Sequence, residues 1–145
     1  METQVIRIGD TQVRILVPSR RKDGGVVDRE LRAEWESRAR SLLEDCYGGA
    51  TPSYVHGSYQ DEGRTTREEI TVLTAACSRQ SLEDDDRKKT LTEFAAQMCR
   101  GLGQDTIFLG WGDESYIIKR DFQYGDVTVL RFTDLPQGSQ VVHLT

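Results

Sequence analysis

The sequence predicts an α+β domain of ferredoxin-like type, in which two helices cover one face of an antiparallel sheet. Three observations support this prediction. Two segments have apolar residues at helical spacing, and β-branched runs flank each of them. The order of elements between Val13 and Trp111 is then β-α-β-β-α-β, which is the split βαβ arrangement. Further β-prone runs predict extra strands near both the N- and C-terminal ends.

The first two β-prone runs cover residues 5–8 and 11–17. Gly9 and Asp10 stand between them, and a glycine in a two-residue connection is typical of a hairpin turn. We therefore expect a β-hairpin at the start of the chain. Pro18 is expected to end its second strand, because proline cannot donate to a sheet ladder.

Two helices are predicted at 28–46 and 86–101. Asp28 is a suitable N-cap for the first helix, and glycines follow its last apolar position. An acidic run precedes the second helix and complements its dipole. The apolar positions of the first helix are Leu31, Trp35, Ala39, Leu42, Leu43 and Cys46, and those of the second include Leu91, Phe94, Ala95, Met98, Cys99 and Leu102.

The remaining strands are expected at 51–59, 69–77, 106–111 and 115–118, with two more in the tail at 126–132 and 140–144. The sheet face opposite the helices is predicted to carry Leu16, Leu73, Cys77 and Phe108. Such a set is too apolar to face water as one patch. The extra strands, or a second copy of the chain, are expected to extend or cover the sheet.

The bulk properties restrict the class of protein. A chain of 145 residues fits a single domain, 1–145. The net charge of -5 argues against nucleic acid as a partner, because non-specific binding draws on a basic face. Three cysteines without a CxxC motif indicate a reducing cytoplasm, with neither disulfides nor a metal site. No apolar run has the length of a membrane helix, and no cofactor motif is present, so neither a membrane nor a cofactor is expected.

Several turn motifs occur between residues 15 and 118. They are Ile-Leu-Val-Pro-Ser at 15–19, Asp-Gly-Gly at 23–25, Tyr-Gly-Gly-Ala-Thr at 47–51, Gly-Ser-Tyr-Gln-Asp-Glu-Gly at 57–63 and Gln-Asp-Thr-Ile-Phe-Leu at 104–109. With these motifs the chain resembles small, largely uncharacterised bacterial and phage ferredoxin-like α+β proteins. The resemblance implies the fold and transfers no catalytic residue.

Two groups of residues are candidates for a site. His56 shares a strand face with Tyr54 by alternation, and Tyr59 is close in sequence. A histidine there could serve as a general base with a tyrosine as donor, although an exposed strand face explains the same pattern. The second group is the basic loop Arg20, Arg21 and Lys22, which could bind phosphate or an acidic partner.

The sequence shows no convergent set of titratable residues. This observation favours a non-enzymatic protein-interaction or regulatory accessory module of a bacterium, phage or mobile element. Its partner would be a protein, including a second copy in a homodimer formed through the sheet. The alternative is a small enzyme on a dimeric ferredoxin-like scaffold that uses His56, Tyr54 and Tyr59. A third interpretation is an RNA-binding sheet face, which the acidic balance and the lack of paired aromatic residues weaken.

Overall fold

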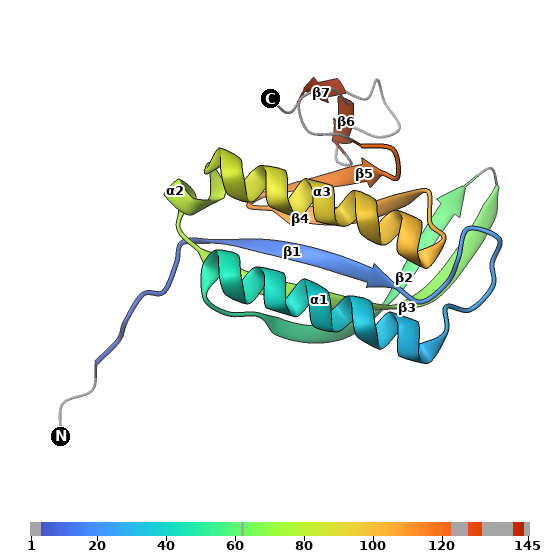
Figure 1. The fold of residues 1–145 in the computed structure, drawn as a ribbon, viewed down its shortest axis with the longest axis horizontal. Helices are drawn as coiled ribbons and strands as arrows, with labels where there is room; N and C mark the ends of the chain where they lie inside the picture. Colours follow the sequence, from blue (N-terminus) through green and yellow to red (C-terminus); the bar gives the residue numbers. More distant parts are fainter. Residues whose placement is uncertain (1–3, 62, 123–127, 132–140, 144–145) are drawn as a thin grey trace.

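The computed structural model describes residues 4–61, 63–122, 128–131 and 141–143 (Figure 1). Three helices and seven strands occur within these ranges. Their order is β1 (Thr11–Pro18), α1 (Arg29–Tyr47), β2 (Thr51–Asp61), β3 (Arg64–Cys77), α2 (Arg79–Leu82), α3 (Asp85–Leu102), β4 (Thr106–Trp111), β5 (Glu114–Lys119), β6 (Thr128–Arg131) and β7 (Val141–His143). The outer parts of both predicted tail strands lie outside the described residues.

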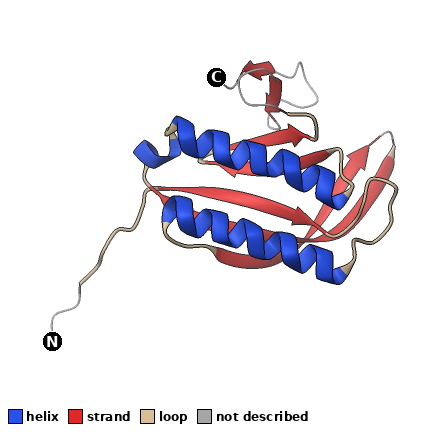
Figure 2. Cartoon of the chain, viewed as in Figure 1, coloured by secondary structure: helices blue, strands red, loops and turns tan. Residues whose placement is uncertain are grey.

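The strands form one sheet in the order β2-β3-β1-β4-β5-β6-β7. Every described pairing is antiparallel. The two long helices, α1 and α3, lie on the same side of this sheet (Figure 2). The predicted α+β architecture with an antiparallel sheet is therefore confirmed. The short helix α2 was not expected, and its N-cap is Ser78, whose side chain accepts a hydrogen bond from the Ser81 amide.

The predicted N-terminal hairpin is wrong. Residues 4–9 form no strand, and the sheet begins at Thr11. The reason is that β1 already pairs with β3 on one side and β4 on the other, so it has no free edge for a hairpin partner. Asp10 instead joins the segment to the sheet: its amide donates to the Cys77 carbonyl at 3.1 Å, and its carboxylate accepts from the Arg79 amide at 3.1 Å.

The core lies between the sheet and the two long helices. Val13, Ile15 and Val17 alternate along β1 and are fully buried. Helix α1 presents Trp35 to them, and the Trp35 ring packs against Phe94 of α3 with centroids 5.7 Å apart. The predicted positions of both helices are thus confirmed to within a residue or two, as is Asp28 as the N-cap of α1.

The opposite face of the sheet differs from the prediction in two residues. Leu16 and Phe108 lie there and line a shallow cavity of about 650 Å³. Leu73 and Cys77 instead belong to the core beneath the helices. The register explains the correction, since Leu73 pairs with Ile15 and therefore shares its face, whereas Leu16 pairs with Val72. The extra strands β5, β6 and β7 extend the sheet sideways.

Candidate active site

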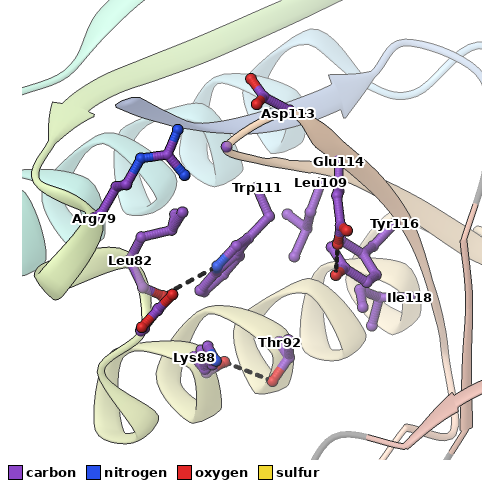
Figure 3. Close-up of a pocket in the computed structure, with 12 residues that line it drawn as sticks. Arg79, Leu82, Lys88, Thr92, Leu109, Trp111, Asp113, Glu114, Tyr116 and Ile118 are labelled. Carbon is purple, nitrogen blue, oxygen red and sulfur yellow. Dashed lines mark hydrogen bonds between the residues drawn. The ribbon is translucent and has the colours of Figure 1, made fainter. Parts of the chain in front are cut away.

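A cavity of about 320 Å³ lies between helices α2 and α3 and the β4–β5 hairpin (Figure 3). Its lining combines an apolar part with charged groups of both signs. Leu82, Leu109 and Ile118 are buried and form the apolar part. A concave, partly apolar site with a few polar groups is the usual form of a small-molecule site.

Trp111 forms the centre of this lining. Its indole Nε1 donates to the Leu82 carbonyl at 3.0 Å, which ties the end of β4 to helix α2. In Figure 3, Arg79 and Leu82 lie on one side of the ring, and Glu114 and Tyr116 lie on the other. Because the polar N–H is already satisfied, the ring offers the cavity an apolar aromatic surface in a fixed position.

The turn between β4 and β5 brings two carboxylates to the cavity. Gly112 has a φ of 62°, a left-handed conformation that favours glycine, and its amide donates to the Gln12 carbonyl at 2.8 Å. Asp113 and Glu114 follow and line the cavity. Glu114 and Tyr116 share one face of β5, and the Tyr116 hydroxyl donates a short hydrogen bond to Glu114 Oε2.

Two cations line the cavity from the helices. Arg79 is the first residue of α2 and Lys88 lies in the first turn of α3. Within the described part of the chain, neither the Arg79 guanidinium nor the Lys88 ammonium has an ion-pair partner. The cavity therefore offers an aromatic surface, cations and carboxylates to one ligand, an arrangement suited to a zwitterion that carries a ring.

The predicted catalytic candidates lie elsewhere. His56 and Tyr54 are exposed on β2 and line a second cavity, of about 340 Å³, between the β2–β3 hairpin and α1. A further cavity, of about 450 Å³, is lined by His56 together with Arg20. The Tyr59 side chain is outside the described residues.

The polar floor of the second cavity is already internally bonded. Arg32 Nη2 donates to Thr71 Oγ1 at 3.1 Å, and that hydroxyl donates to Glu36 Oε1 at 2.5 Å. Arg32 Nε lies 3.2 Å from Glu36 Oε1, an ion pair without hydrogen-bond geometry. These three side chains fasten α1 to β3, so they are less available to a ligand than the charged groups around Trp111.

Two residues of the predicted basic loop, Arg20 and Lys22, already make polar contacts within the chain. The Arg20 amide donates to Glu68 Oε2 at 3.1 Å, and Arg20 Nη1 donates to the Gly24 carbonyl at 3.2 Å. Lys22 Nζ lies 2.7 Å from Asp105 Oδ2. Arg20, Arg21 and Lys22 all line the cavity of about 650 Å³ on the far face of the sheet. Arg20 also lines the cavity that includes His56, whereas Arg21 and Lys22 do not.

The sequence analysis missed the Trp111 cavity. Its lining residues come from α2, α3 and the β4–β5 hairpin, which are separate in the sequence. One local signal was present: Trp111, Asp113, Glu114 and Tyr116 place two aromatic residues and two carboxylates within six positions around a turn. Among the described residues, no three His, Cys, Asp or Glu side chains converge as metal ligands. Within the same residues, no helix is long and apolar enough to span a membrane.

No known family and no curated protein matches the chain. Two solved structures share its fold. A phage SAM lyase in the apo state is 13% identical, covers 84% of this chain and 98% of its own, and has a TM-score of 0.58. A phage SAM lyase in complex with S-methyl-5′-thioadenosine is 14% identical, covers 97% of this chain and 96% of its own, and has a TM-score of 0.51.

These comparisons correct the predicted function. The chain was expected to be a non-enzymatic interaction module, but both matching structures are enzymes, which favours the enzyme alternative. The prediction failed because it took the absence of a local catalytic motif as evidence. The fold assembles a charged aromatic cavity from distant segments, and the sequence around residues 111–116 shows only part of it. The expected relation to phage proteins agrees with the matched structures.

Proposed function

We propose that this protein is an enzyme that binds S-adenosylmethionine and cleaves it as a lyase, in the cavity around Trp111. The observation that supports the proposal is the composition of that cavity, on a fold shared with phage SAM lyases. The free cysteines suit the reducing cytoplasm, where we place the activity.

We also infer the ferredoxin-like topology from the central strands. Their order β2-β3-β1-β4, with α1 after β1 and α3 after β3, supports a split βαβ arrangement. Strands β5 to β7 then extend it beyond β4, and the cavity lies where this extension begins.

Each part of S-adenosylmethionine has a complementary group in the cavity. An adenine ring can stack on Trp111 or Tyr116, and the same aromatic faces attract a cation such as a sulfonium. Arg79 and Lys88 suit the carboxylate of the amino-acid part, while Glu114 suits its ammonium group. The volume of about 320 Å³ lies within the range of small-molecule pockets.

The product named in the second matched structure indicates which bond would break. S-methyl-5′-thioadenosine retains the methyl and adenosyl groups, so the sulfur must separate from the γ-carbon of the amino-acid part. Sulfur keeps the electron pair and becomes a neutral thioether. The carbon fragment either closes onto its own carboxylate or loses a β-proton to a base. Glu114, hydrogen-bonded to Tyr116, is the carboxylate placed to act as that base in the second route.

The positive charge on sulfur decreases during the reaction, and this gives the apolar lining of the cavity a catalytic role. The sulfonium is fully cationic in the substrate and loses part of its positive charge in the transition state. An apolar surface made by Leu82, Leu109 and Ile118 therefore favours the transition state over the substrate. The carboxylates act in the opposite sense on sulfur, so a contribution of Glu114 to the rate comes through its role as a base or through orientation of the substrate.

The test is incubation of the purified protein with S-adenosylmethionine, followed by chromatographic detection of S-methyl-5′-thioadenosine. We expect product with the wild type. Glu114→Gln should lower kcat/KM by about 10²-fold or more if the carboxylate acts in the reaction or orients the substrate. Trp111→Leu should raise KM by removing the stacking surface.

Two controls locate the activity. Glu34→Gln changes an exposed carboxylate on α1, outside the cavity, and should leave the rate unchanged. His56→Ala tests the second cavity and should also retain activity. If His56→Ala abolishes turnover while Glu114→Gln does not, the reaction takes place at β2 instead. Failure of the folded wild type to bind or convert S-adenosylmethionine contradicts the proposal as a whole.

A further inference from the structure

Apart from Val26, the large exposed apolar side chains of the described residues gather in two places. Val5, Ile6 and Ile8 are 96%, 74% and 81% exposed in the N-terminal arm, which we define as residues 4–9. Tyr54 and Val55 are exposed on β2. Apolar residues scattered singly over a surface are ordinary, but a cluster in a short segment indicates a surface that becomes covered.

The arm has a β-strand sequence but pairs with none of the strands that the structure describes. Its alternation places Ile6 and Ile8 on one side and Val5 on the other. The adjoining strand β1 is central in the sheet, and both of its edges are occupied by β3 and β4. Figure 1 shows the arm leaving the sheet and pointing away from the body of the molecule.

The base of the arm is held firmly. Asp10 bonds to the backbone of Cys77 and Arg79, as described above. A Cβ atom on Gly9 would lie 2.5 Å from the Cys77 carbonyl oxygen, so the chain can pass this close only as glycine. The direction in which the arm leaves is therefore fixed by contacts at its base.

Strand β2 offers a free edge of suitable length. It is the outermost strand on its side of the sheet, spans Thr51–Asp61, and pairs with β3 alone among the described strands. An edge strand presents a row of backbone N–H and C=O groups that can pair with another chain. Tyr54 and Val55 lie on opposite faces of this edge, so a strand added there would contact both.

The arm leaves its own chain at the end of the sheet that is distant from Tyr54 and Val55. Tyr54 lies opposite Thr71, and Thr71 lies opposite Val17, whereas the arm joins β1 at Thr11. A strand added outside β2 would also lie about 14 Å sideways from β1, three strand spacings away. Because the arm points away from the body of the molecule (Figure 1), the β2 edge of a second copy is the better placed partner.

We propose that the arm of one copy of this chain adds as a strand to the β2 edge of a second copy. Backbone hydrogen bonds supply the pairing, and the alternating apolar side chains of the arm cover Tyr54 and Val55. Reciprocal exchange closes a dimer, and head-to-tail addition closes a ring. This mode of self-association is independent of the proposed lyase activity.

The test measures molar mass by light scattering over a range of protein concentrations. The arm variant is Ile6→Glu with Ile8→Glu, and the edge variant is Tyr54→Lys with Val55→Lys. Glu34→Lys, which changes the charge of an exposed residue on α1 outside both surfaces, is the control. We expect the wild type and the control to reach at least twice the monomer mass, and both designed variants to remain monomers with unchanged circular dichroism.

Mixing the two designed variants tests the pairing directly. The arm variant keeps an intact edge, and the edge variant keeps an intact arm, so their mixture should form a one-to-one complex that neither forms alone. A monomeric wild type at every concentration overturns the proposal. So does an arm variant that associates as the wild type does, or a mixture of the two variants that stays monomeric.

Discussion

Gly101 has no room for a side chain, because the indole ring of Trp35 occupies the space where its Cβ would stand. Trp35 itself is only 6% exposed, packs against Phe94, and carries the Arg38 guanidinium 4.0 Å above its ring. A large ring on α1 thus fits against a position without a side chain on α3. The two residues set the closest approach of the two helices and should be energetically coupled.

Trp35→Ala should destabilise the fold by about 3–5 kcal/mol, since it removes a buried aromatic ring and leaves a cavity. Chemical denaturation monitored by circular dichroism measures this free energy of unfolding. Arg38→Gln is the control, because it removes only the exposed cation above the ring. A loss below about 1 kcal/mol for Trp35→Ala would contradict the buried packing.

Gly101→Ala sets two effects against each other. Alanine gains about 1 kcal/mol of helix propensity over glycine, but overpacking against Trp35 costs about 1–3 kcal/mol. We expect a net destabilisation in the wild-type background. In the Trp35→Ala background the obstruction is gone, so the same substitution should become stabilising. Equal effects in the two backgrounds would show that the residues are not coupled.

The Cys99 thiol makes the free energy of unfolding depend on pH in the alkaline range. Burial raises the pKa of its thiol to about 12, partly offset by Arg100 and Arg120, and its Sγ donates to the Ile118 carbonyl at 3.4 Å. Burial also raises the pKa of the Cys46 and Cys77 thiols. All three thiols should therefore react slowly with thiol reagents in the native state.

The raised pKa of the Cys99 thiol lowers the stability of the fold at alkaline pH. Above pH 9 the thiol of the unfolded chain ionises while the folded one stays neutral, so the free energy of unfolding falls until about pH 12. Cys99 contributes a slope of at most about 1.4 kcal/mol per pH unit. Cys99→Ala should reduce this slope, measured by denaturation at a series of pH values. An unchanged slope would show that Cys99 ionises alike in both states.

At the scale of elements, the sequence predicted what local patterns determine. Helix α1 follows from its apolar spacing and from Asp28, whose carboxylate accepts from the Glu30 and Leu31 amides at 2.8 and 3.3 Å. The prediction of an N-terminal hairpin was wrong because a β-prone pattern does not indicate which strand edges are free. The predicted face of Leu73 was wrong because strand register depends on pairing between distant segments.

Asp28→Ala should cost about 1 kcal/mol of stability, since two amides at the start of α1 lose their acceptor. Asp28→Asn is the matched variant, because its side-chain oxygen can still cap the helix. Thermal unfolding of both variants measures the difference. Equal melting temperatures for the alanine and asparagine variants would show that solvent replaces the cap without cost.

At the scale of the whole molecule, the Trp111 cavity could not be predicted from sequence patterns. Arg79 follows β3, Lys88 begins α3, and Trp111 and Glu114 flank the β4–β5 turn. They converge because α2 and α3 pack beside the hairpin, with the Trp111 to Leu82 hydrogen bond joining them. His56 and Tyr54 could be recognised as sharing a face, but their position on an edge strand could not be read from alternation.

The central position of β1 also determines when the sheet can form during synthesis of the chain. This strand is synthesised well before β4, which is one of its two neighbours in the sheet. The sheet cannot close around β1 until β4 follows, and such non-local pairing slows folding. A chain that ends at residue 103 should be digested rapidly by protease, while the full chain resists. Until β4 has been made, the apolar side chains of β1 lack one of their neighbouring strands, and such an incomplete sheet is prone to aggregation.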